Sequence, residues 1–225
     1  MKESGADFVK RSMNRIGAIA TLVAATAAAI LAQASPAQAR ALRAGDCGPG
    51  VESIQSALAA QRYDTGGVDG CYGPATSAAL RAFQHARGLA STGRADDATL
   101  QSLRRTRPLQ ARLSGPGRWI EVDKLRQVLL VVRNGQVAAV YAVSTGQPGF
   151  DTPSGRFTVT RKETRSWSVP YGVWLPWASY FNAGIAVHAG AIPGRPASHG
   201  CVRVPESLAA AIYRRMPLGT RVVVY

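Results

Sequence analysis

One segment of the chain combines residue types that support nucleophilic chemistry. The chain has three histidines and three cysteines, and His188, His199 and Cys201 lie together in residues 188–201. Glycines and prolines interrupt this segment, which predicts a shaped loop rather than a helix: Gly190, Pro193, Gly194, Pro196 and Gly200. A thiol becomes a strong nucleophile when a neighbouring base removes its proton, and imidazole is a common base. The segment therefore predicts an active site.

A reactive Cys201 needs a base, a group that orients the base, and donors for a developing oxyanion. His188 follows the apolar run 185–187, so a strand is expected to deliver its imidazole to the loop. A neutral imidazole there accepts the thiol proton and later returns it to a leaving amine. The backbone N–H groups of Gly200 and Cys201 are unobstructed candidates for the oxyanion site. The predicted chemistry is acyl transfer through a thioester.

The same residues leave two other interpretations open. Buried cysteine and histidine often only fill a core. Alternatively, His188, His199 and Cys201 with one water would form a zinc site, although the spacing of His199 and Cys201 is unusual for paired ligands. Acidic residues are sparse in 118–225, which argues against a glycosidase that uses two carboxylates: Glu121, Asp123, Asp151, Glu163 and Glu206.

The N-terminal residues have the features of an export signal. Residues 16–31 carry no charge, and small residues at 37–39 favour cleavage before residue 40. Basic residues precede the uncharged run: Lys2, Lys10, Arg11 and Arg15. We therefore predict a signal peptide over residues 1–39. An uncleaved anchor is the alternative, and Met13 is an alternative start.

The charge of the chain indicates its surroundings. The formal net charge is +14 at pH 7, and it stays strongly positive without residues 1–39. A basic exported protein is attracted to anionic polymers of the wall over long distances. Nucleic acid is disfavoured by export and by the lack of a basic and aromatic recognition motif. The oligomeric state is left open.

The cysteines are unevenly placed along the chain. Cys47 and Cys71 both lie in its first half, whereas Cys201 stands alone in the second. Cysteines of exported proteins tend to pair, so we predict a Cys47–Cys71 disulfide and a free Cys201. Pairing of Cys47 or Cys71 with Cys201 is the alternative and would remove the nucleophile. The predicted bond would stabilise a small domain by roughly 3 kcal/mol in the chain-entropy model.

Residues 44–104 are expected to form a small helical domain. Apolar residues at helical spacing predict a helix around 51–58, and a second helix is predicted from Pro74 to Phe83. Acidic residues at 96–97 favour the start of a third. Because a core of this size is marginal, a disulfide is plausible here. His85 is expected on a helix surface.

The pattern changes after a segment rich in glycine and proline, residues 105–117, which we expect to be a linker. Only 206–216 is predicted to be helical in the remainder. Short β runs dominate, with a hairpin turn at Asn134-Gly135: residues 119–122, 128–133, 137–144, 157–160 and 221–225. Residues 118–225 therefore predict a mostly-β domain large enough for one core.

The segment V-D-G-C-Y-G-P-A-T at residues 68–76, followed by Phe83-Gln84, resembles the peptidoglycan-binding domain of wall enzymes. The resemblance implies a three-helix module that adheres to wall glycan or its peptides. The alternative for its single residues is structural. Asp69, Gly70 and Gly73 would then only shape a loop, and Phe83 would only fill the core.

The run H-x-G-x-x-P-G-x-P-A-S-H-G-C-V-R at residues 188–203 resembles the signature of the L,D-transpeptidase (YkuD) catalytic domain. Upstream matches are V-S-T-G at 143–146, T-P-S-G at 152–155 and W-L-P-W at 174–177. The resemblance implies a multidomain fold, α plus mostly β. A small three-helix peptidoglycan-binding domain is expected before a YkuD-like β-sandwich domain.

The resemblance also implies roles for single residues. Cys201 is the expected nucleophile, and His188 is the expected base, oriented by the backbone carbonyl of Ala189. The loop is expected to be built by Ser198, His199 and Gly200. Arg203 and Gly190 are assigned to substrate binding, with structural packing as an equal alternative for Arg203. Ala189 stands where many members have glycine, and the spacing from His188 to Cys201 is short.

The implied function is that of an exported peptidoglycan L,D-transpeptidase that uses no cofactor or metal. It is expected at the wall or in a periplasm, and its expected roles are wall biogenesis and cell shape. It would release the terminal D-alanine of a stem tetrapeptide and form a 3→3 cross-link. The alternatives are an L,D-carboxypeptidase of the same fold, a catalytically idle wall-binding protein and a zinc hydrolase. The S-x-x-K motif of penicillin-type serine enzymes is absent. Five aromatic residues are candidates for a peptide groove or for the core: Tyr171, Trp174, Trp177, Tyr180 and Phe181.

Overall fold

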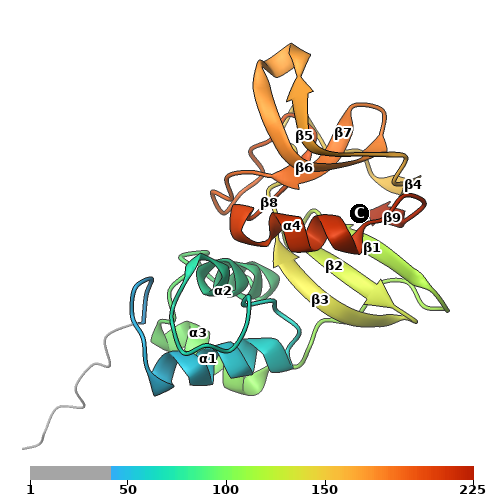
Figure 1. Cartoon of the computed structure of the whole chain (residues 1–225). Helices are drawn as coiled ribbons and strands as arrows, with labels where there is room; N and C mark the ends of the chain where they lie inside the picture. Colours follow the sequence, from blue (N-terminus) through green and yellow to red (C-terminus); the bar gives the residue numbers. More distant parts are fainter. Residues whose placement is uncertain (1–41) are drawn as a thin grey trace, which may run out of the picture. The chain divides into compact units, whose positions relative to one another are not determined.

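The computed structural model of the protein describes residues 42–225. The predictions made for residues 1–39, including the signal peptide, the anchor alternative and the Met13 start, lie outside these residues. The described residues all belong to one compact unit. Three helices come first, and two β-sheets with a fourth helix follow (Figure 1). Within this part of the chain every helix falls short of the length and apolarity that a membrane span requires.

The three predicted N-terminal helices are confirmed: α1 (Pro49–Ala60), α2 (Pro74–Ala86) and α3 (Asp97–Arg105). Both α1 and α2 begin with proline, whose fixed φ and missing N–H suit a first helical turn. The carboxylate of Asp96 accepts a hydrogen bond from the Thr99 N–H at 2.8 Å and caps α3. Leu58, Leu80 and Phe83 are fully buried and form the centre of this region.

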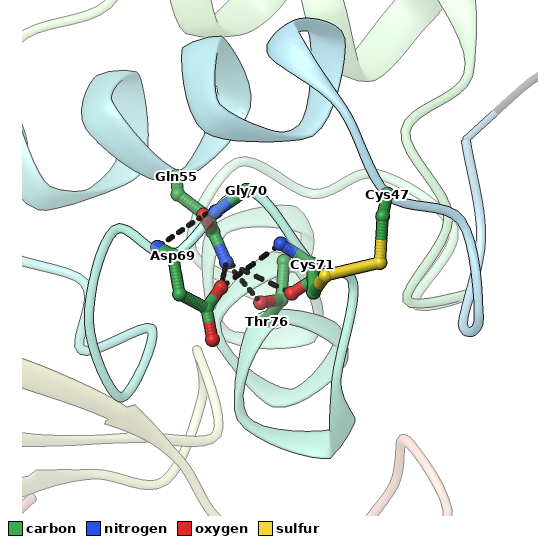
Figure 2. Close-up of a disulfide and its surroundings, with 6 residues drawn as sticks. All are labelled: Cys47, Gln55, Asp69, Gly70, Cys71 and Thr76. Atoms are coloured by element: carbon green, nitrogen blue, oxygen red, sulfur yellow. Dashed lines mark hydrogen bonds between the residues drawn. A yellow bond between two sulfur atoms is a disulfide. The ribbon is translucent and has the colours of Figure 1, made fainter.

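Cys47 and Cys71 form the predicted disulfide (Figure 2), and Cys201 is free. The bond joins the residue just before α1 to the loop that precedes α2. It therefore closes the loop that contains α1, which is the loop the chain-entropy argument considers.

A buried side-chain amide organises the loop beside this disulfide (Figure 2). Gln55 Nε2 donates hydrogen bonds to Asp69 Oδ1 at 2.7 Å and to Thr76 Oγ1 at 3.0 Å. Its Oε1 accepts one from the Gly70 N–H at 2.8 Å. The Asp69-Gly70 pair thus shapes a loop, and Phe83 fills the core, as the structural alternative for these residues states.

The first β-sheet has five strands in the order β3-β2-β1-β9-β4. Strands β1 and β9 are parallel, and the other neighbours are antiparallel. The hairpin turn predicted at Asn134-Gly135 joins β2 to β3, and both of its residues have positive φ, 50° and 77°. The strands are β1 (Arg118–Asp123), β2 (Val128–Arg133), β3 (Gln136–Ala142), β4 (Gly155–Thr158) and β9 (Arg221–Val224).

The second β-sheet has four strands in the order β5-β6-β7-β8. Sequence analysis assigned no strand to the segments of β5 and β6, which form a long hairpin joined by a 3₁₀ turn at Val169–Tyr171 and extending beyond the rest of the sheet (Figure 1). Strands β7 and β8 are parallel. The strands are β5 (Arg161–Ser168), β6 (Val173–Asn182), β7 (Ile185–Ala189) and β8 (Val202–Val204).

The two sheets share a hydrophobic core, as the implied β-sandwich requires. Ile120 and Leu129 of the first sheet belong to the same buried cluster as Val187 of the second. The predicted helix is present as α4 (Glu206–Arg215), which contributes Leu208 and Ile212 to this cluster.

The opposite face of the five-stranded sheet is covered by the helices. Trp119, Leu130 and Val132 belong to one buried cluster with Leu58 and Phe83 of the helical region. The helices and the sheet therefore share a core. This covered face explains why β2 is buried at every position except the last.

Residues 105–117, expected as a linker, are held in place by a buried carboxylate. Glu121 is 0% exposed and accepts hydrogen bonds from the backbone N–H groups of Arg112 and Leu113 at 2.8 and 3.0 Å. Leu109 and Leu113 pack against the cluster shared by helices and sheet. The segment joins the two regions without acting as a loose tether.

Candidate active site

A cavity of about 910 Å³ contains almost all of the predicted site residues. The β5–β6 hairpin contributes aromatic walls, among them Trp167, Tyr171 and Trp174. The predicted residues that line it are His188, Gly190, Ser198, His199, Cys201 and Arg203. The fold thus places both ends of the segment, His188 and Arg203, in the lining of one cavity.

His188 lies at the end of β7 and is 6% exposed. Its Nδ1 is 2.8 Å from the carbonyl oxygen of Ala189. Because a carbonyl only accepts, Nδ1 carries the proton in this bond, and Nε2 of the neutral ring is an acceptor. Burial lowers the pKa of His188, the bond to Ala189 opposes this, and the charge of Arg203 adds to the lowering. His188 is therefore a neutral base near pH 7.

Cys201 directly precedes β8, and its thiol contacts the carbonyl oxygen of Gly184 at 3.9 Å. Burial raises the pKa of Cys201, whereas a hydrogen bond with the backbone of Ala186 and the charge of Arg203 lower it. The net direction is upward, so the resting group is a thiol. A thiol of this kind attacks a carbonyl only after a base takes its proton.

Ser198 and Gly200 shape the loop, as expected. Ser198 is buried, and its hydroxyl donates to the carbonyl oxygen of Cys201 at 2.5 Å. The hydroxyl oxygen of Ser198 also accepts a hydrogen bond from the Gly200 N–H at 3.1 Å. The φ of Gly200 is +107°, a conformation that suits only glycine well. Since its N–H is already bonded, Gly200 contributes to an oxyanion site only if that bond opens. Its oxyanion role stays a prediction.

A second loop, residues 144–152, supports the first, and sequence analysis assigned it no role. The carbonyl oxygen of Thr145 accepts the Ser198 N–H at 3.0 Å. Thr152 is buried, and its hydroxyl donates to the carbonyl oxygen of Gly200 at 2.9 Å. The V-S-T-G and T-P-S-G matches mark this loop in the sequence, but only the fold reveals what it touches.

Arg203 and Gly190 lie side by side. A Cβ atom on Gly190 would come within 3.1 Å of the Arg203 side chain, so the glycine leaves room for the arginine. The backbone N–H of Arg203 donates to Ser144 at 3.0 Å. Because Arg203 lowers the pKa of both His188 and Cys201, its charge acts on the site whatever else it contacts.

His199 makes aromatic contacts, in contrast to His188, whose ring is hydrogen-bonded to the backbone. Its ring packs against Phe150 and Tyr171, with centroids 4.5 and 4.9 Å apart. Of the five aromatic candidates, those that line the cavity are Tyr171, Trp174 and Tyr180. Phe181 belongs to the core instead, and the partly buried Trp177 packs against it.

The zinc alternative lacks a ligand cluster. In residues 42–225 no three side chains of histidine, cysteine, aspartate or glutamate lie close enough to hold one metal ion.

Comparison with known proteins assigns both regions to families. Residues 117–224 match the family described as L,D-transpeptidase catalytic domain (YkuD). Residues 47–103 match the family described as "Putative peptidoglycan binding domain". The search of curated proteins found no match.

Solved structures agree with this assignment. The L,D-transpeptidase (residues 123–326) from Xylanimonas cellulosilytica is 34% identical with a TM-score of 0.75, and the match covers 82% of this chain and 97% of that one. An L,D-transpeptidase from Stackebrandtia nassauensis is 28% identical with a TM-score of 0.51, over 82% and 94%. The chain belongs to the L,D-transpeptidase family.

Proposed function

We propose that the protein is an exported peptidoglycan L,D-transpeptidase that forms 3→3 cross-links through an acyl-enzyme on Cys201. One observation carries this proposal. The buried imidazole of His188 has its Nδ1 fixed on Ala189, and His188 lines the same cavity as the free thiol of Cys201. This arrangement supplies a neutral base and a nucleophile for an amide carbonyl.

In the first half-reaction Cys201 attacks the carbonyl of residue three of a stem tetrapeptide. His188 Nε2 takes the thiol proton as the carbon–sulfur bond forms. The bond to the terminal D-alanine then breaks, and the leaving amine receives that proton from His188. The products are a thioester on Cys201 and free D-alanine.

In the second half-reaction the side-chain amine of a diamino acid on a neighbouring stem attacks the thioester. His188 accepts a proton from the amine and returns it to the sulfur of Cys201 as the carbon–sulfur bond breaks. The new amide is the 3→3 cross-link. With water as the acceptor, the same steps give an L,D-carboxypeptidase.

The surroundings of the thiol support a peptide donor. Arg203 and Arg161 line the cavity and place positive charge where a stem peptide presents carboxylates. The match of residues 47–103 to a peptidoglycan-binding family supports the wall as the partner. Export follows from the expected signal peptide and would bring the site to its substrate.

The test uses defined disaccharide tetrapeptides with residues 40–225, the expected mature chain. Products are identified by mass spectrometry for the wild type and for Cys201→Ala. Dimers that have lost one D-alanine are the expected result, and Cys201→Ala should give none. Monomeric tripeptide alone would instead identify a carboxypeptidase.

A matched control separates the loss of the thiol from a loss of folding. Leu218→Ala changes an exposed apolar side chain, 63% accessible, outside the cavity, and should leave dimer formation intact. Equal activity of Cys201→Ala and the wild type would refute the proposed nucleophile.

A further inference from the structure

The segment that joins His188 to Cys201 rests on the helical region. Ile192 packs against the buried cluster to which Phe83 of α2 belongs. A Cβ atom on Gly194 would lie 3.4 Å from Ser91 Cβ and 3.8 Å from His85 Nε2. Pro193, which lies between them, is exposed, and so are the flanking residues Ala191 and Arg195. The segment therefore turns alternate residues toward the helical region.

The contact buries polar atoms of the helical region. His85 was expected on a helix surface, but it is half-buried, and its Nε2 is closed off from solvent. The hydroxyl oxygen of Ser91, in the loop between α2 and α3, is also buried. Both atoms lie beside Gly194. The approach is close enough to exclude solvent, so it is a packed contact.

The other side of the segment is fixed to the second loop. Ser144 Oγ donates to the carbonyl oxygen of Arg195 at 2.8 Å. The N–H of Ala197 donates to the carbonyl oxygen of Thr145 at 3.0 Å. Ser198, which bonds to Cys201, follows directly. A displacement at Ile192 or Gly194 would therefore also shift Ser198, whose hydroxyl is hydrogen-bonded to the backbone of Cys201.

The helical region is itself anchored to the five-stranded sheet. The Val140 N–H donates to the carbonyl oxygen of Arg62 at 2.8 Å. The Tyr141 hydroxyl donates to Asp64 Oδ2 at 2.7 Å. These bonds add to the shared hydrophobic cluster, so the helical region is a firm support.

We propose that the helical region positions the catalytic loop, with Ile192 as the positioning residue. This role goes beyond peptidoglycan binding and does not depend on any ligand of the helical region. The segment is rich in glycine and proline and lacks a regular hydrogen-bond ladder, so its path is set by the contacts on its two sides. Small misplacements near reacting atoms cost about 100-fold in rate.

The first test replaces Ile192 in the full chain and measures acylation of Cys201 by a carbapenem with intact-protein mass spectrometry. The lining of the cavity comes from residues 161–206 alone, so this probe can react there without touching the helical region. We expect Ile192→Ala to lower the limiting acylation rate by about 10-fold to 100-fold, with little change in the half-saturating concentration. Ile192→Val keeps the branched side chain and should restore most of the rate. Unchanged acylation in Ile192→Ala would overturn the proposal.

The second test approaches the loop from the helical region. Ser91→Leu places a bulky side chain against Gly194, whereas Ser53→Leu makes the same change on an exposed position of α1. We expect about a 10-fold slower acylation in Ser91→Leu alone. Equal rates in the two variants would count against the proposal, and this pair decides the question if Ile192→Ala fails to fold.

The two proposals fail in different ways. A wild-type protein that no carbapenem acylates would weaken the proposed function. Iodoacetamide alkylation of the free Cys201 then provides the same comparison among the variants. Slower alkylation in Ser91→Leu than in Ser53→Leu would still support the positioning role, and equal alkylation would contradict it.

Discussion

The two sheets of the protein differ in how they are covered. The five-stranded sheet has helices on one face and the sandwich core on the other, and β2 is buried along almost its whole length. The four-stranded sheet shares that core but borders the cavity, and β5 is mostly exposed or half-buried. The five-stranded sheet therefore contributes mainly to stability, whereas the four-stranded sheet leaves side chains exposed to the cavity. Substitutions in the five-stranded sheet are expected to change stability, and substitutions at the cavity are expected to change activity.

The largest effect is expected for His188→Gln, at the edge of the cavity. Removing the base should lower kcat/KM for cross-linking by about 100-fold to 10,000-fold. His199→Gln is the matched comparison and should cost less, because the His199 ring packs against Phe150 and Tyr171. Steady-state rates with tetrapeptide donors check both variants. A larger loss in His199→Gln would reverse the assigned roles.

The next effect is on stability and belongs to the five-stranded sheet. Leu130→Ala should lower the free energy of unfolding by about 2–5 kcal/mol, since Leu130 is 2% exposed in the shared cluster. Val169→Ala, at the tip of the β5–β6 hairpin and 80% exposed, should change it by less than about 0.5 kcal/mol. Urea unfolding measures both. Similar values would break the contrast between the sheets.

A smaller effect is expected for Thr152→Val, where the second loop meets the first. The variant keeps the shape of the side chain but loses the hydroxyl, which accepts the Gly146 N–H at 2.9 Å and donates to the carbonyl oxygen of Gly200. Leaving that buried acceptor without its partner should cost about 1–3 kcal/mol of stability. Thr152→Ser keeps the hydroxyl and serves as the control in thermal unfolding. An unchanged midpoint in Thr152→Val would mean that the bond contributes nothing.

The smallest expected effect is a shift in pH dependence. His188 must be neutral to act as a base, and burial lowers its pKa. Acylation of Cys201 should therefore fall as the pH drops, with a midpoint below the ordinary imidazole value of about 6.5. Carbapenem acylation between pH 4 and 8 measures this limb. A midpoint above the ordinary value would show that the imidazole is stabilised in its charged form.

The strands of the five-stranded sheet were predicted from the sequence better than those of the four-stranded sheet. Valine-rich runs and the Asn134-Gly135 turn identify β1 to β3 and β9, because buried strands need apolar residues. Strand β5 is largely charged, and β6 buries its apolar residues without strict alternation, so periodicity did not reveal the hairpin. Its side chains use other contacts, such as Arg161 over the Tyr180 ring at 3.8 Å. Propensity alone does not encode such pairs.

The main residues of the candidate site were predictable from the sequence, but the residues that support them were not. His188 and Cys201 are marked by residue type and spacing, and the cavity contains both. The contacts of Thr152 and Ile192 join segments that are far apart in the chain, so no local sequence pattern predicts them. Residues 105–117 were expected only as a linker, and their fixed path was not predicted, because no sequence pattern marks the hydrogen bonds that Arg112 and Leu113 donate to Glu121.

The place of β9 in its sheet has a consequence for folding. This strand comes last in chain order, yet it pairs with β1, the first strand of the sheet, and with β4. The sheet cannot close until these remote segments meet, and such non-local pairings fold slowly. Until then the backbone N–H and C=O groups at the facing edges of β1 and β4 lack their partner strand and are open to pairing with other chains. Slow closure of the sheet therefore prolongs the time during which these edges are exposed to aggregation.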